Sequence, residues 1–373
     1  MNLKGKIDYL TMKIVFKKDN KNFHKEMNTA VNIYFESTHQ NKKANAYMYF
    51  KTFLFLSILI ISYLSILFAD FNLLVSYIAW IFLGLSSVFL AVNCGHDAIH
   101  GAYSAHKFIN KIMSRSYDLL GANSYMWSIT HNVVHHTYTN IEGADEDVDS
   151  IPFTRLTPHK KWKSTHRYQH IYVFFLYSLS TLFWVFTKDY KKFFQKNIGN
   201  YDNKNHPAIQ YINLFVFKLI YYFLFLLLPL MLVDMPWYLI LGCFVLGHLV
   251  EGLTIATIFA LAHIVENATF LIPNEHGMME HNWAIHQLYT TADFGRKSKL
   301  TSFLTGGLNF QIEHHLFPSI CHVHYPIVSE IVKQKALEFG IPYNEYDSFF
   351  DALKSHIRLL KKMGVEPEDV VNG

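Results

Sequence analysis

Four long apolar stretches, arranged in two pairs, restrict the folds that this chain can adopt. The first pair occupies residues 52–69 and 71–92, and the second pair occupies residues 209–233 and 237–262. Each stretch has about the 20 residues that a helix needs to cross the hydrocarbon core of a membrane. The connection within each pair is so short that the two helices must be antiparallel neighbours. The pattern therefore predicts an all-α integral membrane protein with four transmembrane helices in two hairpins.

The composition agrees with a protein that lies in lipid. Only 17% of the residues are charged, compared with about 25% in soluble domains. The net charge of +4 is mild, and no dense basic stretch with interleaved aromatic residues indicates nucleic-acid binding. The three cysteines have no CxxC spacing, so we interpret them as reduced and unpaired, as suits a protein that faces the cytoplasm.

The distribution of lysine and arginine predicts the orientation. Residues 1–50 and the section 107–204 are rich in both, whereas the two hairpin turns carry Asp70 and Asp234. By the positive-inside rule, both termini and the long middle section lie in the cytoplasm.

Three segments follow from this orientation. We expect a cytoplasmic N-terminal segment over 1–50, a central domain over 51–325 and a cytoplasmic helical tail over 326–373.

Lys218 interrupts the third apolar stretch, so we expect that end of the helix near the interface, where a lysine can snorkel. A further apolar segment, 171–186, is short for a span and is more typical of an interfacial helix.

Histidine is the most unusual residue of the chain, with 22 copies that gather in clusters. Positions i and i+4 share one face of a helix, so two imidazoles at that spacing can reach one metal ion. This spacing occurs in HDAIH, directly after the second apolar stretch, and in HNVVHH, while QIEHH and NWAIH follow the fourth stretch. The motif histidines are His96, His100, His131, His135, His136, His286, His314 and His315.

Several such clusters on one side of a membrane favour a metal site over chance. A lone histidine pair is commonplace, but buried imidazoles without a compensating partner are costly near a bilayer. Eight imidazoles without a thiolate exceed the four ligands of a tetrahedral zinc site. The set fits two octahedral or five-coordinate ions, and imidazole suits iron, copper, nickel and zinc alike.

The same clusters decide the place of residues 171–186. With four spans, two motifs precede the third span and two follow the fourth, so all of them face the cytoplasm. A fifth span would split the motifs across the bilayer. We therefore place 171–186 in or along the interface, and we expect a cytoplasmic helical cap that holds a histidine-rich dimetal site.

HDAIH, HNVVHH and QIEHH resemble the three histidine boxes of the membrane fatty acid desaturase family in order and in approximate spacing. The resemblance spans about residues 50–325, so residues 51–325 would form a desaturase domain. Gln311 at the head of the third box resembles the front-end subgroup, which inserts a double bond between an existing one and the carboxyl end. The strings HDAIHGAYS and GGLNFQIEHHLFP look like bacterial acyl-CoA desaturases of the linoleoyl-CoA type.

This resemblance implies an enzyme that uses O2 and two non-haem iron ions to insert a cis double bond into an acyl chain. The chain would be carried by CoA or by a phospholipid. The motif histidines would be the metal ligands, with His286 as an extra ligand and Asn282 as a water-mediated one. Gln311 would be a weak or water-mediated ligand.

Other polar residues near the motifs are expected to support the ligands. Asp97 and Asn132 lie between motif histidines, and Glu313 lies between Gln311 and His314. In these positions they could fix imidazole tautomers. Asp145 begins an acidic run that imitates an EF-hand loop, but Ser150 stands where that loop requires glycine, so the match fails.

Two further sets of histidines lie outside the motifs. His263, with Glu266 three residues later, is expected either to support the ligands or to cap its helix. The remaining histidines, among them His322 and His324, lack the motif spacing and are expected at the surface or the interface.

Electrons are expected from a separate carrier. The sequence lacks the HPGG motif of the cytochrome b5 domain that is fused to many eukaryotic front-end desaturases. We expect a carrier such as ferredoxin, or cytochrome b5 with its reductase. The resemblance to bacterial enzymes implies the bacterial inner membrane as the expected location.

Polar residues elsewhere are candidates for substrate binding. His248 and Glu251 lie three residues apart within the fourth stretch, where they could line a narrow acyl-chain tunnel or form a buried hydrogen-bonded pair. A basic run could contact CoA phosphates or anionic lipid, although an ordinary positive-inside surface explains it equally well. That run comprises Arg155, Lys160, Lys161, Lys163 and Arg167.

Two alternatives compete with desaturation. A lipid or carotenoid hydroxylase or ketolase of the same superfamily would share the boxes, although QIEHH favours desaturation. A histidine-rich metal transporter is the second alternative. Transporters place their sites at the bilayer midplane on broken or repeated helices, whereas here the clusters lie at the ends of spans and the sequence has no internal repeat.

Overall fold

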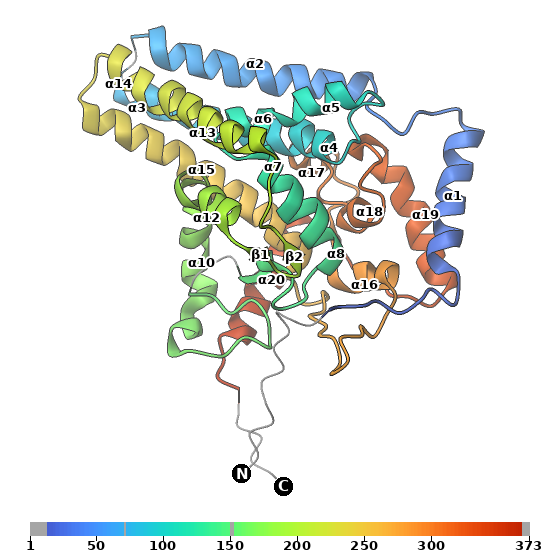
Figure 1. Cartoon of the computed structure of the whole chain (residues 1–373). Coiled ribbons are helices and arrows are strands. Elements are labelled where there is room, and N and C mark those ends of the chain that lie inside the picture. The colour runs from blue at the N-terminus through green and yellow to red at the C-terminus, as the bar shows by residue number, and fades with distance from the viewer. Residues whose placement is uncertain (1–12, 71, 150–152, 368–373) are drawn as a thin grey trace.

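The computed structural model describes residues 13–70, 72–149 and 153–367, and its architecture is mostly helical (Figure 1). Within those residues, four helices are long and apolar enough to cross a membrane, as predicted. They are Ala46–Phe68 (α2), Leu73–Ile99 (α3, η1 and α4), Ala208–Leu232 (α13, η5 and α14) and Trp237–His263 (α15).

Asparagine caps begin the first two of these helices. The Asn45 side chain accepts a hydrogen bond from the backbone N–H of Met48, which starts α2 ahead of the predicted boundary. The Asn72 side chain accepts from the backbone N–H of Val75 and starts α3 in the same way. A side-chain oxygen at this position satisfies one of the free N–H groups of the first helical turn.

The second span is longer than the predicted 71–92. α3 (Leu73–Leu90) continues through a π-helical turn, η1 (Ala91–Gly95), into α4 (His96–Ile99). The first histidine motif therefore lies on the end of the span itself.

The remaining elements gather mostly at one end of the long helices (Figure 1). Two short strand pairs are present, β1 (Asn197–Ile198) antiparallel to β2 (Tyr201–Asp202) and β3 (Asp293–Phe294) parallel to β4 (Glu345–Tyr346). The third span consists of α13 (Ala208–Tyr222), η5 (Phe223–Leu227) and α14 (Leu228–Leu232). The other helical elements are α1 (Phe23–Ser37), α5 (Lys107–Ser114), α6 (Ser116–Leu119), α7 (Ser124–Trp127), η2 (Ser128–His135), α8 (His136–Tyr138), α9 (Glu146–Asp149), η3 (Ser164–Tyr168), α10 (Gln169–Ser178), α11 (Ser180–Phe183), η4 (Trp184–Lys188), α12 (Asp189–Phe194), α16 (Trp283–Thr290), α17 (Lys299–Thr305), α18 (Gln311–Leu316), η6 (His322–His324), α19 (Tyr325–Glu338) and α20 (Phe349–Met363).

α3 and α15 cross closely because each contributes a glycine to the contact. A Cβ atom at Gly84 would lie 2.5 Å from the carbonyl oxygen of Gly247, and one at Gly247 would lie 3.2 Å from the carbonyl oxygen of Trp80. Any side chain at Gly84 would therefore push the two backbones apart. Both helices lead from this contact to histidines of the candidate site.

The third span contains a buried ion pair. Lys218 Nζ lies 2.8 Å from Asp189 Oδ2 of α12, and both side chains are almost completely buried. The ammonium group also donates to the carbonyl oxygens of Gly121 and Val185, at 2.6 and 2.9 Å. The expectation that Lys218 snorkels to the interface is wrong, because protein groups surround its charge. The pair ties α13 to the segment before it.

Residues 164–194 form a bent pair of helices. Ser164–Ser178 and Ser180–Phe194 meet at an angle of 55°. A Cβ atom at Gly252 of α15 would clash with the carbonyl oxygen of Ser178, so α10 lies directly against α15. The bend falls inside the predicted helix over 171–186, which is therefore broken into two pieces.

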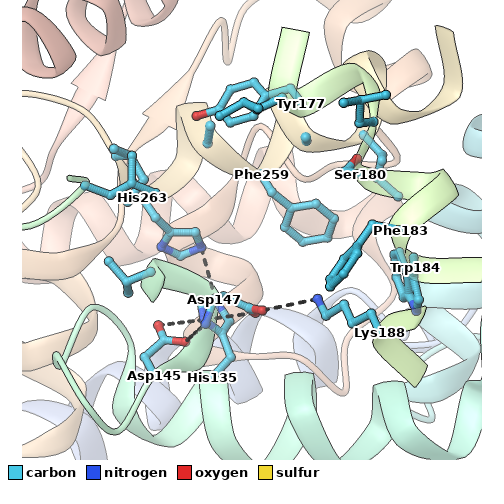
Figure 2. Close-up of a pocket in the computed structure, with 18 of the residues that line it drawn as sticks. His135, Asp145, Asp147, Tyr177, Ser180, Phe183, Trp184, Lys188, Phe259 and His263 are labelled. Atoms are coloured by element: carbon cyan, nitrogen blue, oxygen red, sulfur yellow. Dashed lines mark hydrogen bonds and ion pairs between the residues drawn. The ribbon is translucent and has the colours of Figure 1, made fainter. Parts of the chain in front are cut away.

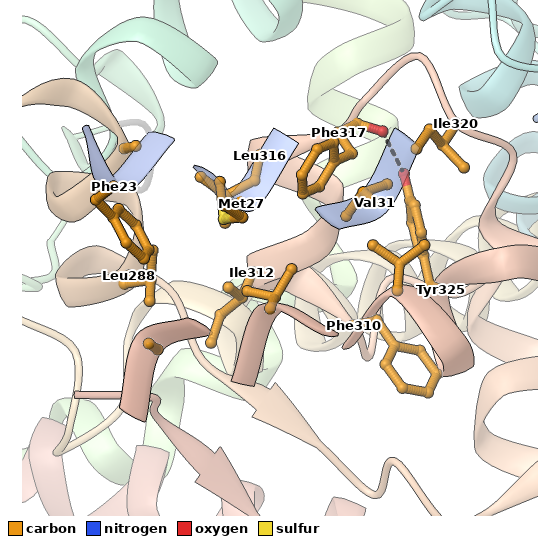
Figure 3. Close-up of a cluster of buried hydrophobic side chains, with 14 of the residues drawn as sticks. Phe23, Met27, Val31, Leu288, Phe310, Ile312, Leu316, Phe317, Ile320 and Tyr325 are labelled. Carbon is orange, nitrogen blue, oxygen red and sulfur yellow. Dashed lines mark hydrogen bonds between the residues drawn. The ribbon is translucent and has the colours of Figure 1, made fainter. Parts of the chain in front are cut away.

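Elements from both ends of the chain pack around the third histidine motif (Figure 3). α1 contributes Phe23, Met27 and Val31 to a buried apolar cluster. The same cluster contains Ile312 of α18 and Tyr325 of α19. The N-terminal and C-terminal segments thus enclose the helix that carries the third motif; residues 1–12 and 368–373 lie outside the described part of the chain.

Candidate metal centre

The first two histidine motifs lie on helices that contain π-helical turns. η1 directly precedes His96, and η2 contains His131. Such turns are rare and are frequent at functional sites. The His131 ring stacks on Trp127 with centroids 4.6 Å apart. The Asn132 amide donates to the Ile99 carbonyl oxygen at 3.1 Å, which ties the second motif to the first.

The third motif lies on α18, a short helix in which every residue is buried. His314 and His315 are consecutive, so their side chains leave the helix in different directions. The fourth span reaches the same region with its last residue, His263, which is also buried.

Imidazole rings from all three motifs converge on one buried region. Their ring nitrogens form overlapping groups in which the atoms lie within 4.8 Å of one another. The first group is His96, His100, His131 and His314; the second is His135, His263 and His315; and a third, His136 with His314 and His315, joins the other two.

The distances within the cluster are too short for neutral rings to satisfy one another. His131 Nε2 lies 3.0 Å from His96 Nε2 and 3.3 Å from His136 Nε2. His136 Nε2 in turn lies 2.9 Å from His314 Nε2. A ring nitrogen of neutral imidazole is either a donor or an acceptor, never both. Four nitrogens in such a row can form at most two hydrogen bonds, so the contact between His131 and His136 stays unsatisfied, and a cation among the rings would relieve it.

The protonation state of the rings also fits metal binding. The buried Nε2 atoms of His100 and His315 have no hydrogen-bond partner among the described residues. Burial, and then the neighbouring imidazoles, lower the pKa of the central rings well below the ordinary value of 6.5, so these rings are neutral and present lone pairs to a metal. This applies to His100, His131, His136, His314 and His315.

His263 belongs to this cluster, whereas His286 lies outside its groups. His263 Nε2 lies 3.2 Å from His135 Nε2. His286 Nε2 lies 2.9 Å from the carbonyl oxygen of Thr139, and its ring packs edge-on against Phe16. A backbone carbonyl thus engages one of its two ring nitrogens, and the ring belongs to none of the ligand groups of the cluster. The geometry favours His263 in the place that the sequence analysis gave to His286.

Gln311 and Asn282 were both expected near the metal, and the structure separates them. The Gln311 amide nitrogen lies 2.9 Å from His263 Nε2, beside the cluster. The Asn282 side chain instead caps α16, where its Oδ1 accepts from the backbone N–H of Ile285 at 3.0 Å. Its amide nitrogen donates to Asp19 at 3.1 Å.

The groups that fix the imidazole rings were not found by sequence reasoning. Asp145 Oδ2 accepts from His135 Nδ1 at 2.9 Å, and Gln287 Oε1 accepts from His315 Nδ1 at 2.8 Å. Such bonds hold the ring so that Nε2 faces the cluster. Burial lowers the pKa of His135, but the Asp145 carboxylate outweighs burial and raises the pKa above its ordinary value. The available signal was the acidic run after HNVVHH, which resembles a failed calcium loop.

The residues that were expected in this role have other partners. Asp97 Oδ2 accepts from His322 Nδ1 at 2.9 Å, so His322 is buried and does not lie at the surface as expected. Glu313 Oε1 accepts from the Tyr343 hydroxyl at 3.0 Å. Asn132 holds the end of the first motif, as described above. All three act on the segments that carry the histidines, and none of these bonds is made to a ring of the cluster.

A cavity of about 360 Å³ opens beside His135 and His263 (Figure 2). Its volume falls in the range of about 300–1,000 Å³ that is usual for ligand pockets. Asp145, Asp147 and Lys188 form its polar end next to His135. The rest of the wall comes mainly from α15 and the bent segment and is apolar: Leu176, Leu179, Phe183, Trp184, Ile255, Ala256 and Phe259.

His248 and Glu251 line a separate, much smaller cavity of about 20 Å³. His248 Nε2 meets the Tyr221 hydroxyl at 2.7 Å, and its Nδ1 lies 3.3 Å from Glu251. Another cavity of about 20 Å³ shares Glu251 with the first and shares Trp184 and Ile255 with the large cavity. The three cavities therefore follow one another along α15.

The basic run divides into a buried residue and its more accessible neighbours. The Arg155 guanidinium is buried and donates to the carbonyl oxygens of Pro158, Lys160 and Met363. It therefore links this loop to the end of α20 and is not available to a head group. The other members are half-buried or exposed: Lys160, Lys161, Lys163 and Arg167.

The long apolar helices and the histidine cluster at their ends define a class of helical membrane protein with a site able to hold metal. The chain belongs to the fatty acid desaturase family, whose sequence model matches residues 72–347. It is therefore an enzyme that desaturates fatty acids, which sets aside the transporter alternative.

Individual relatives cover nearly the whole chain. An sn-1 linoleoyl-lipid 6-desaturase of Arthrospira platensis is 33% identical over 96% of this chain and 96% of its own length. A protein of the same name from Synechocystis sp. is 34% identical over 92% of this chain and 95% of its own length. An acyl-lipid (8-3)-desaturase of Physcomitrium patens is 34% identical over 93% of this chain and 72% of its own length.

Proposed function

We propose that this protein is an O2-dependent front-end desaturase that acts on lipid-linked acyl chains and uses two iron ions. The observation that carries the proposal is the apolar cavity that ends at His135 and His263. An acyl chain in this cavity would have one of its methylene groups beside the histidine cluster. The names of the relatives, which specify linoleoyl-lipid and acyl-lipid substrates, support a lipid carrier over CoA.

The donor set that we assign to iron contains histidines and one amide. Bound iron supplies the activation of O2 that removal of hydrogen from an unactivated methylene requires, because no protein acid or base can attack such a bond. The proposed ligands are His96, His100, His131, His135, His136, His263, His314 and His315, with Gln311 as a weak or water-mediated ligand.

The remaining residues of the site position the chain and exclude water. Phe259 and Ile255 of α15 face the bent segment across the cavity, so the acyl chain is held between two helical walls. We place its methyl end toward Glu251 and His248, because the small cavities continue in that direction. In the overall reaction, –CH2–CH2– becomes –CH=CH– and O2 becomes two waters, with two electrons and two protons from outside the protein.

The charge distribution supports the proposed orientation. We place the protein in the bacterial inner membrane with the metal centre and both termini on the cytoplasmic side, where positively charged loops are favoured. In this setting residues 171–186 lie along the interface. Exposed cations before α10 are the candidates for contact with lipid head groups: Lys161, Lys163 and Arg167.

Product analysis tests this proposal. A host that expresses the chain is fed linoleate, and its fatty acids are examined by gas chromatography–mass spectrometry. We expect a new double bond between the carboxyl group and the existing ones, absent with His135→Ala and present with His159→Ala, which changes an exposed histidine outside the cluster. A hydroxylated product would contradict desaturation and would show that the protein is a hydroxylase.

Purified protein tests the carrier and the metal. It is given linoleoyl phosphatidylcholine or linoleoyl-CoA together with a reductant, and iron is measured in parallel. Conversion of the phospholipid with two irons per chain is expected. Conversion of the CoA ester alone would contradict the lipid assignment, and protein without bound iron would contradict the metal assignment.

A further inference from the structure

We propose that electrons enter the metal centre through Trp283, from an acidic one-electron carrier protein that docks on the lysine-rich segment 13–25. The inference rests on the proposed function, because each double bond requires two electrons from outside the protein. It adds a location and a partner chemistry to that requirement.

Trp283 connects the protein surface to a residue of the centre. It is the first residue of α16 and is half-buried. Its indole N–H donates to the carbonyl oxygen of His136 at 3.0 Å, and the His136 ring belongs to the histidine cluster. One hydrogen bond therefore separates the indole from the main chain of a proposed ligand. An aromatic ring in this position shortens the gap that an electron must cross.

The N-terminal segment also contacts the indole. The rings of His24 and Trp283 meet edge-to-face with centroids 5.5 Å apart. The Asn282 amide, next to Trp283, donates to Asp19 at 3.1 Å. Val15 adds a backbone bond to Gly277 at 2.9 Å. The segment is thus fixed over the start of α16.

This segment carries a strong excess of positive charge. Asp19 is its single acid, and that carboxylate is engaged with the backbone N–H groups of Phe23 and His24. Glu26 and Glu280 border the segment and leave the excess positive. Its exposed cations are Lys13, Lys17, Lys18, Lys21 and Lys25.

The positive charge of segment 13–25 indicates what kind of carrier protein can dock there. Opposite charges steer two proteins into encounter and raise the association rate, whereas a basic carrier would be repelled. A small iron–sulfur or haem protein with an acidic surface matches the segment. The lysines could instead contact anionic lipid, so the experiment must separate these two partners.

The first test replaces the indole. Iron-loaded desaturase is mixed with a reduced acidic ferredoxin in a stopped-flow instrument, and the oxidation of the ferredoxin is followed in the presence of O2 and substrate. We expect Trp283→Leu to lose most of the ferredoxin-driven rate and Trp283→Phe to recover part of it. Trp162→Leu is the matched control, because Trp162 is also half-buried and donates its N–H to a carbonyl, that of Gly364, outside the centre.

A chemical reductant separates electron entry from damage to the site. Single-turnover desaturation driven by dithionite with a small mediator is measured for the same proteins, together with their iron content. We expect Trp283→Leu to match the wild type in both. Unchanged ferredoxin-driven turnover in Trp283→Leu would overturn the proposal. If wild-type protein forms no product even with dithionite, the proposed function itself fails.

The second test reverses charge at the docking segment. For Lys21→Glu with Lys25→Glu, we expect the second-order rate constant with ferredoxin to fall about 10-fold at low ionic strength, and the difference to shrink as salt is added. The rate at saturating ferredoxin should stay the same. The control pair, Lys354→Glu with Lys361→Glu, changes two exposed lysines of α20 and should have little effect.

Two results would overturn the docking surface. One is an equal loss of rate in the control pair, which would indicate a response to net charge alone. The other is loss of binding to vesicles of phosphatidylglycerol and phosphatidylethanolamine with an unchanged ferredoxin rate, which would assign these lysines to lipid.

Discussion

Replacement of Asp145 by asparagine tests whether the metal centre depends on the carboxylate behind His135. Asp145 Oδ2 accepts from His135 Nδ1 at 2.9 Å, and both side chains are almost completely buried. The same oxygen accepts from the backbone N–H of Asn140, also at 2.9 Å, so the main chain fixes its position. The substitution preserves the shape of the side chain, removes its charge and weakens the bond that orients the ring.

The structure sets the expected magnitude. A hydrogen bond to a charged group contributes about 1.5–3 kcal/mol. Each 1.4 kcal/mol corresponds to a factor of about ten in an equilibrium constant, so we expect metal affinity to fall about 10- to 100-fold. Loss of the partner behind a metal-bound histidine has effects of about this size in other proteins.

Iron retention against a competing chelator, followed in detergent solution, measures the change directly. Asp147→Asn is the matched control, because Asp147 Oδ2 lies 3.8 Å from the same ring nitrogen and its side chain is 33% exposed. Its effect should be clearly smaller. If Asp145→Asn holds iron as tightly as the wild type, or if both substitutions weaken it equally, the carboxylate does not act through His135.

Three further predictions test other parts of the structure. His263→Ala should lose iron and activity while His286→Ala keeps its iron, as measured by mass spectrometry of the metal; the reverse result would restore the ligand set inferred from sequence. Ala256→Phe should fill part of the large cavity and reduce desaturation of long chains more than of short ones at unchanged iron content, which product analysis over a chain-length series would show; an equal loss at all lengths would count against the cavity as the acyl site. Lys218→Met should destabilise the protein by about 3–5 kcal/mol by leaving Asp189 buried without its partner, and adding Asp189→Leu should recover most of this loss in thermal unfolding; no recovery would mean that the pair is not the cause.

The spans and most of the histidine cluster could be predicted because their signals are local. Hydropathy over about 20 residues identifies a spanning helix, and the i, i+4 spacing of His131 and His135 identifies a shared helix face. His263 has no motif partner. It enters the cluster only because the last turn of α15 packs beside Gln311 of α18, and tertiary contacts of this kind leave no mark on sequence spacing.

The partner groups were missed for the same reason. Asp145 reaches His135 because the chain turns between them, with Asn140 in the left-handed region at φ 58°. Lys218 looks like a charge near a membrane interface as long as Asp189, its partner from another helix, is not considered. Sequence patterns within one helix could not show either contact.

The glycine contact between α3 and α15 has a mechanical consequence. From Gly84 to His96 and from Gly247 to His263 the helices extend roughly 18 and 24 Å, at 1.5 Å per residue. The two helices therefore cross at this glycine contact and carry His96 and His263 near their far ends. A small change in the crossing angle is magnified at those ends. The spacing of the histidine cluster thus depends on a contact far from it, within two helices that are long and apolar enough to span a membrane.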